Sequence, residues 1–354
     1  MVRTTPPRLV DLEELFPGLS PHARTSTLLH PRWGSPGVEE SSVGGPLLWP
    51  AGEAWPTCPK EHGAGFLGES VARVRADRAR KAAEALGRPA PATGASGGNP
   101  LEQVAQALAH DVPGPMPLLP VAQLYARDVP DLPTRPGTDL LQVLWCPFDH
   151  DVDEFCAPST RLVWRDSTAV NRRALLSDPP EPATVEVAEY VPSPCVLHPE
   201  QVVEYPPANE LYEVLDEELC LEIADWCLSQ LPDGEKIAAV SENEPYENAN
   251  LYDEIAASSA FKVGGWMIWG SIDPYTVACS CGAAMTPLMQ IGSGEWWSSA
   301  GYWTPIEDLD AARRRVITPH SFGNPPEIVL PRGLRMHIYL CPDDPAHTRT
   351  QVLA

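Results

Sequence analysis

The stretch "FKVGGWMIWGSIDPYTVACSC", Phe261 to Cys281, decides the fold because it repeats an earlier part of the same chain. The earlier stretch, "SSVGGPLLWPAGEAWPTCP", Ser41 to Pro59, has the same Val-Gly-Gly, followed at the same interval by a tryptophan, and a cysteine stands near its end as well. Self-similarity of this kind is the signature of repeated structural units. The sequence therefore predicts two related halves.

Two further matches follow in the same order along the chain. "MPLLPVAQLY" (116–125) resembles "MTPLMQIGSG" (285–294), and "DLLQVLWCPFDH" (139–150) corresponds to "GLRMHIYLCPDDPAH" (333–347). These runs are short, apolar and bounded by glycine, proline and aspartate, which is typical of strands. We interpret Val-Gly-Gly as a tight turn into a strand. The pattern predicts an α+β protein made of two related repeats, rich in short antiparallel strands with inserted helices.

The predicted boundaries follow from these matches. The first repeat is expected over residues 1–177, with a helical and flexible insertion at about 64–113, and the second over 261–354. Residues 178–260 are expected to connect the two repeats and to contain a helix at about 210–231.

In that connecting helix, Cys220 and Cys227 recur with apolar residues at helical spacing. Such spacing places side chains on one buried face of a helix. Both cysteines are therefore predicted to lie in the core and to bind no metal.

The charge of the chain limits its partners. Lysine and arginine total 25 against 48 aspartate and glutamate, a formal net charge of -23 over 354 residues. Phosphate backbones and anionic membrane surfaces would be repelled, so a nucleic-acid or membrane partner is disfavoured. A basic protein or peptide is the better expectation.

The apolar segments are too short for membrane insertion. None approaches the roughly 18 residues needed to span a bilayer, and the start, "MVRTTPPRLVDLEELFPGLS", lacks an apolar signal-peptide core. A cytoplasmic location is expected. Because cytosolic thiols stay reduced, the nine cysteines indicate metal ligation or burial more than disulfides.

Cysteine and histidine recur together in both repeats. "CPKEH" and "CPFDH" supply Cys58, His62, Cys146 and His150 in the first repeat. The corresponding ends in the second repeat carry Cys279, Cys281, Cys341 and His347. Four thiolate and imidazole donors form the set that tetrahedral zinc prefers, so the sequence predicts two structural zinc ions. Cys195 and His198 are a rival pair that could replace the cysteine and histidine of one Cys-Pro-x-x-His turn.

The second repeat also carries a resemblance to a known family. "FKVGGWMIW", "CSCGAAMTPLMQI" and "GLRMHIYLC" resemble the pattern of the YwqG-like bacterial proteins and, more distantly, the C-terminal domain of programmed cell death protein two. The eukaryotic relatives have a Cys-x-x-Cys-Gly turn where this chain has the shorter Cys279-Ser-Cys281-Gly. The resemblance implies protein handling, such as escorting a ribosomal protein, binding peptides or acting near toxin systems.

Two functions stay open from the residues. The first is a non-catalytic protein- or peptide-binding protein of chaperone, adaptor or toxin-immunity type, in which the tryptophan-rich loop with Trp296, Trp297 and Trp303 lines the binding surface. The alternative is a zinc-dependent hydrolase, which needs an open coordination position for water. The sequence contains no His-Glu-x-x-His helix or Gly-x-Ser-x-Gly elbow. We therefore expect no catalysis.

Overall fold

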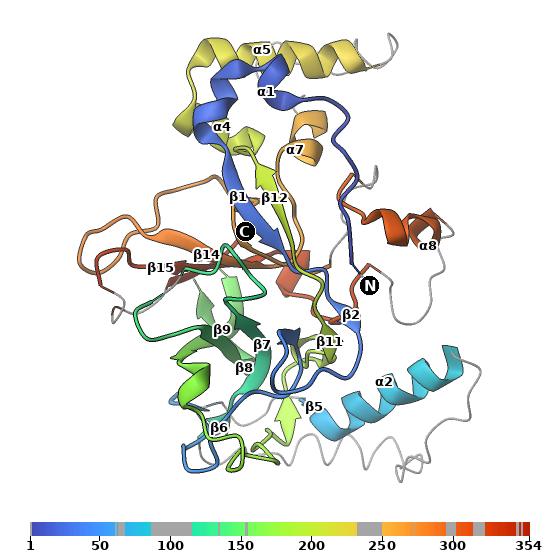
Figure 1. The fold of residues 1–354 in the computed structure, drawn as a ribbon, viewed down its shortest axis with the longest axis vertical. Coiled ribbons are helices and arrows are strands. Elements are labelled where there is room, and N and C mark those ends of the chain that lie inside the picture. The colour runs from blue at the N-terminus through green and yellow to red at the C-terminus, as the bar shows by residue number, and fades with distance from the viewer. Residues whose placement is uncertain are drawn as a thin grey trace.

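The computed structural model describes residues 2–60, 62, 68–85, 115–133, 135–152, 155–231, 250–270, 272–294, 302–313, 323–344, 347 and 350–354. Two six-stranded antiparallel sheets form the body, and several helices gather at one end (Figure 1). The predicted α+β class is confirmed.

Both sheets draw strands from distant parts of the sequence. The first sheet contains, in spatial order, β2 (Arg32–Trp33), β11 (Cys195–Val196), β3 (Ser42–Val43), β7 (Leu119–Tyr125), β8 (Leu140–Val152) and β9 (Phe155–Arg165). The second sheet contains β12 (Glu200–Glu204), β1 (Arg24–Leu28), β13 (Lys262–Gly264), β14 (Thr286–Ile291), β15 (Met336–Leu340) and β16 (Thr350–Leu353).

The two sheets have the same order if β1, β2, β3, β7, β8 and β9 are matched in turn to β11, β12, β13, β14, β15 and β16. In this match the first strand of each series lies in the sheet of the other series: β11 lies between β2 and β3, and β1 lies between β12 and β13. The two sheets are thus joined by a reciprocal strand exchange between the two series. The strands β11 and β12 belong to the segment that was expected only to connect the repeats. A duplication would produce this order, and the duplication itself stays a prediction.

Two buried glutamines make matching hydrogen bonds in the two sheets. The amide oxygen of Gln123 accepts from a backbone N–H at 2.7 Å, and that of Gln290 accepts at 2.9 Å; each amide nitrogen donates to two carbonyls. The partners are Leu48, Val38 and Glu40 for Gln123, and Ile268, Ser258 and Ala260 for Gln290. These partners stand at one constant interval along the chain, so both amides fix equivalent loops around β3 and β13.

The Val-Gly-Gly motif ends a strand instead of leading into one. Gly44 follows β3, and Gly264 with Gly265 closes β13, all three with positive φ (62°, 74° and 70°). A Cβ at Gly44 would lie 2.6 Å from the carbonyl oxygen of Ser193. Glycine is therefore required there by both conformation and space.

One core lies between the two sheets. Because side chains alternate across a strand, Leu141, Val143 and Trp145 of β8 enter this core together with Met336 and Ile338 of β15. The intervening residues point to the opposite, outer face of each sheet, where separate small clusters form. The outer faces carry the residues discussed below.

A charged pair is buried on the outer face of the second sheet. Lys262 and Glu204 both have fully buried side chains, and Nζ of Lys262 donates to the two carboxylate oxygens at 3.0 and 2.8 Å. Glu204 also accepts from the backbone N–H groups of Ser258 and Trp266, at 2.9 and 3.0 Å. The hydrogen bonds satisfy both charges, as burial requires.

The helices form their own core at one end of the molecule (Figure 1). They are α1 (Leu12–Leu15), α4 (Ala208–Val214), α5 (Glu217–Gln230) and α7 (Asn250–Ala256). Cys220 and Cys227 are buried there, as predicted. The single helix predicted at about 210–231 is wrong: Asp216 accepts a hydrogen bond from the N–H of Leu219 and begins a new helix.

Two helices lie outside this end. The predicted insertion supplies α2 (Val71–Ala85), whose Val71 and Val74 join the main core. A short α8 (Leu309–Arg313) follows the tryptophan-rich loop. The loop and second helix predicted within the insertion lie outside the described residues.

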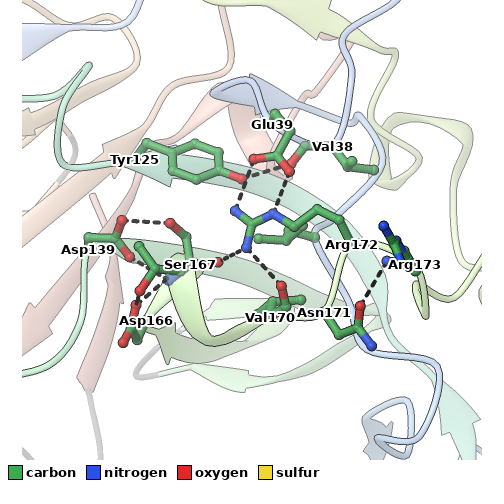
Figure 2. Close-up of polar contacts among 12 residues, drawn as sticks. Val38, Glu39, Tyr125, Asp139, Asp166, Ser167, Val170, Asn171, Arg172 and Arg173 are labelled. Atoms are coloured by element: carbon green, nitrogen blue, oxygen red, sulfur yellow. Dashed lines mark hydrogen bonds and ion pairs between the residues drawn. The ribbon is translucent and has the colours of Figure 1, made fainter.

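The segment after β9 is fixed to the loop before β3 (Figure 2). Arg172 donates through Nε to Glu39 at 2.7 Å and through Nη1 to the carbonyls of Ser167 and Val170. Asp139 accepts from the N–H and the hydroxyl of Ser167, both at 2.6 Å. These contacts are near the surface, so their main effect is to set the path of the segment.

Candidate metal centres

The first donor group, Cys58, His62, Cys146 and His150, forms on the outer face of the first sheet. Cys58 ends β4 (Thr57–Cys58), which pairs with β6 (Met116–Pro117), and His62 follows shortly after. Cys146 and His150 both lie in β8. The two Cys-Pro-x-x-His segments predicted from the sequence therefore meet, although the second lies within a strand, at its register shift between Trp145 and Asp149, and is not a turn.

The distances in this group suit a tetrahedral ion. Sγ of Cys146 lies 3.0 Å from Nε2 of His62, and Sγ of Cys58 lies 3.6 Å from Nε2 of His150. All four donor atoms lie within 4.8 Å of one another. Tetrahedral zinc, with bonds of about 2.0–2.3 Å, separates its donors by roughly 3.3–3.8 Å. The group needs only small adjustments to hold the ion.

Burial controls the protonation of the first group. It lowers the pKa of His150 to about 4, with a further contribution from Lys60, and it also lowers the pKa of His62. Burial, followed by the neighbouring Cys58 thiol, raises the pKa of Cys146. The imidazoles are thus neutral and ready to donate, while the thiols need a nearby cation to ionise.

The second donor group, Cys279, Cys281, Cys341 and His347, forms on the outer face of the second sheet. Nδ1 of His347 lies 3.4 Å from Sγ of Cys279 and 3.4 Å from Sγ of Cys341. Sγ of Cys281 lies 3.6 Å from Sγ of Cys341. The short Cys279-Ser-Cys281 turn, closed by a bridge between Ala278 and Ala284, still directs both sulfurs to the group.

Charges within the second group differ from those in the first. The backbone N–H of Cys281 is the main cause that lowers the pKa of Cys279 to about 6. Hydrogen bonding to Cys341 first, and then to Cys279, raises the pKa of His347. A thiolate is therefore accessible at neutral pH, and it is the form that binds a metal.

The two groups occupy matching places in their sheets. The N–H of Leu118 donates to the carbonyl of Pro56, and the N–H of Met285 donates to that of Val277; the first cysteine of each group stands two residues after the accepting residue. The third donor of the first group, Cys146, lies on the outer face of β8, and that of the second group, Cys341, lies directly after the matched strand β15. The groups differ in one donor type, His62 against Cys281, and in the spacing of the donors along the chain.

The other predicted residues lie elsewhere. Cys195 is buried in β11 within the main core, and neither it nor His198 belongs to a donor group. Trp296 and Trp297 lie outside the described residues. Trp303 is buried, with 8% of its surface exposed, and its indole N–H donates to the carbonyl of Glu254 at 2.8 Å.

Sequence reasoning missed a further set of residues. Arg24, Glu210 and Tyr339 line a cavity on the outer face of the second sheet. The available signal was the alternation in "MHIYL", which places Tyr339 on the same face as Cys341.

No protein-family model matches the chain, and no curated protein matches it. No helix in the described part of the chain is long and apolar enough to cross a membrane. The functional argument therefore depends on the geometry of the donor groups and of the surrounding surface.

Proposed function

We propose that the chain is a non-catalytic protein- or peptide-binding protein, cytoplasmic and of chaperone, adaptor or toxin-immunity type, held together by two structural zinc ions. The observation that carries the proposal is the convergence of four thiol and imidazole donors, twice, within 4.8 Å in each group. Four protein donors fill a tetrahedral ion and leave no position for a reacting water.

The surroundings of both groups support a structural role. Cys58 and Cys146 belong to an apolar cluster with Trp49 on the outer face of the first sheet. Cys279 and Cys341 belong to the corresponding cluster with Trp269 on the second. Each ion would join chain segments that are distant in sequence and would close a cluster too small to hold by burial alone.

The donor set favours zinc over other biological cations. Magnesium and calcium prefer oxygen ligands, whereas thiolate and imidazole together suit zinc. Imidazole binds a metal in its neutral form, which burial favours in the first group.

The proposed binding role depends on the charge and on Trp303. With Tyr302, Pro6, Val202 and Ile255, Trp303 lines a half-open cavity of about 300 Å³. The guanidinium of Arg8 lies 5.5 Å from its ring, and within the described part of the chain Arg8 contacts backbone carbonyls and aromatic rings. The cavity thus offers apolar walls to a partner side chain, and the acidic surface would attract a basic partner.

Elemental mass spectrometry of the purified chain tests the zinc proposal. We expect two zinc ions in the parent, and one in each of the double variants Cys58→Ser/Cys146→Ser and Cys279→Ser/Cys341→Ser. Cys156→Ser changes an exposed cysteine outside both groups and should retain two. Zinc-free parent protein, prepared without chelators, would refute the proposal.

Cobalt substitution tests whether the sites are closed. Four protein donors at each site should give tetrahedral cobalt spectra that added anions do not change. A spectrum that shifts with azide would reveal an open position and favour the hydrolase.

A peptide array tests the binding proposal. Basic peptides with an apolar residue should bind the parent, and Trp303→Ala should weaken that binding more than Trp33→Ala, which alters a tryptophan that is 44% exposed elsewhere. Equal binding by the parent and by Trp303→Ala would remove Trp303 from the proposed surface.

A further inference from the structure

A half-open cavity of about 310 Å³ lies on the outer face of the second sheet, and Trp303 is not among the described residues that line it. The rings of Trp269, Tyr275 and Tyr339 and the side chains of Met267 and Met285 line it, and its surface is about as polar as it is apolar. Trp269 and Tyr275 lie 5.3 Å apart between ring centroids, and 47% of the Tyr275 surface is exposed. Apolar concave sites with a few polar groups are typical of ligand sites.

Two donors at this cavity have no protein acceptor in the described part of the chain. The guanidinium of Arg24 lies 3.4 Å above the ring of Trp266, which holds it flat, yet it makes no hydrogen bond or ion pair with a described residue. The hydroxyl of Tyr339, a residue only 5% exposed, likewise has no hydrogen-bond partner there. A fixed guanidinium and a hydroxyl beside each other match the two oxygens of a carboxylate.

The first sheet shows the same chemistry completed within the chain. Arg165 lies 4.2 Å above the ring of Trp49, the counterpart of Trp269, and donates to both carboxylate oxygens of Glu53 at 2.6 and 2.7 Å. Trp55 closes over Trp49 at 4.9 Å. An arginine stacked on a tryptophan therefore already binds a carboxylate in one half.

Among the described residues that line the cavity Glu210 is the acidic one, and it is the charged group that acts most strongly on both Arg24 and Tyr339. Its Oε1 accepts from the indole N–H of Trp269 at 2.6 Å, so this carboxylate is directed toward the tryptophan. Its charge opposes a second carboxylate nearby and would favour a cation. The sign of its effect on binding therefore distinguishes the two kinds of ligand.

We infer that this cavity binds a carboxylate that carries an apolar or aromatic group, with the carboxylate on Arg24 and Tyr339 and the apolar group packed against the rings of Trp269 and Tyr275, which already contact each other. The C-terminus of a peptide and a small aromatic acid share this chemistry. The inference does not depend on the proposed zinc ions or on the Trp303 surface.

Isothermal titration calorimetry with N-acetyl-phenylalanine and its amide tests the inference on the full chain. The acid should bind at least tenfold more tightly than the amide, because only the acid offers a charged acceptor to Arg24. The peptide N-acetyl-Ala-Ala-Ala-Phe distinguishes the two kinds of ligand. If it binds more tightly than N-acetyl-phenylalanine, the ligand is the C-terminus of a peptide; if the two bind equally, the ligand is a small acid. Equal binding of acid and amide, or no binding of either, would overturn the inference.

Variants test the two donors and the charge. Arg24→Gln should weaken the binding of N-acetyl-phenylalanine about tenfold or more, and Tyr339→Phe should weaken it about two- to tenfold. Glu210→Gln keeps an acceptor for the indole N–H of Trp269 but removes the negative charge, so it should tighten the binding of the acid. Arg127→Gln, which alters an arginine stacked on Tyr125 at 3.9 Å, is the matched control and should change nothing. Circular dichroism confirms that each variant is folded.

The opposite pattern would overturn the inference. If Glu210→Gln weakened binding and Arg24→Gln strengthened it, the cavity would be a cation site. If neither changed the affinity for the acid, the probe would bind elsewhere.

Discussion

Replacing Lys262 by methionine should destabilise the protein by a large fraction of its folding free energy. The substitution removes three hydrogen bonds, two to Glu204 and one to the carbonyl of Trp266, and leaves the Glu204 carboxylate buried with only two N–H donors. Removing one partner of a buried ion pair costs about 3–5 kcal/mol. The whole free energy of unfolding of a typical domain is only about 5–15 kcal/mol.

The double variant Lys262→Met/Glu204→Gln should recover much of this loss, because no uncompensated charge remains. The first sheet supports this expectation: Ser42 faces Gln123 where Lys262 faces Gln290, so an uncharged residue is accepted at the matching position. Lys81→Met, on α2, controls for the loss of a lysine.

Urea unfolding at pH 7, followed by circular dichroism in the presence of zinc, measures the effect. We expect the unfolding midpoint to fall steeply for Lys262→Met and to return toward that of the parent for the double variant. A single variant within about 1 kcal/mol of the parent would contradict the reasoning, because breaking a buried pair cannot be so inexpensive.

Three further predictions follow from other parts of the molecule. Chelation of zinc at pH 7 should lower the thermal unfolding midpoint and added zinc should restore it, as followed by circular dichroism; an unchanged midpoint would argue against structural zinc. Burial raises the pKa of Asp253 from 3.8 to about 6, so the stability that its protonated form contributes is present below pH 4 and is lost as the pH rises through 6. Between pH 4 and pH 7, Asp253→Asn should therefore gain on the order of 2–3 kcal/mol of unfolding free energy relative to the parent, as measured by urea unfolding. A difference between variant and parent that stays constant with pH would contradict this. Residues 1–177, expressed without the rest, lack β11 and should not unfold cooperatively, whereas co-expression with 178–354 should give a folded complex; a cooperative fragment would show that the exchanged strand is dispensable.

The donor groups were accessible from the sequence because their signals are local. The first group is marked by two Cys-Pro-x-x-His segments, and the matched runs of the two predicted repeats indicated the corresponding cysteines and histidine of the second group. The strand exchange was not accessible, since β11 and β2 contain two residues each and pair through contacts distant in sequence. Strands of this length carry no measurable periodicity.

The sequence did not reveal the break between α4 and α5 or the cavity lined by Arg24 and Tyr339, and the reasons differ. Asp216 lies within an uninterrupted helical pattern, and only its hydrogen bond to the N–H of Leu219 reveals the break. Arg24 and Tyr339 are isolated in sequence, so no spacing rule brings them together. Their proximity is a product of the fold.

The reciprocal strand exchange has a mechanical consequence. An unfolding enzyme that pulls on the C-terminal end meets β16, an edge strand whose backbone pairs with β15 on one side. The Gln351 side chain adds hydrogen bonds to Pro158 and Thr160 of β9, so detaching β16 breaks one ladder and this one side-chain contact. Pulling on the N-terminal end loads β1, which is hydrogen-bonded on both sides, to β12 and β13. The molecule should therefore resist threading from its N-terminus more strongly than from its C-terminus, with the sheet order giving the chain a preferred direction of degradation.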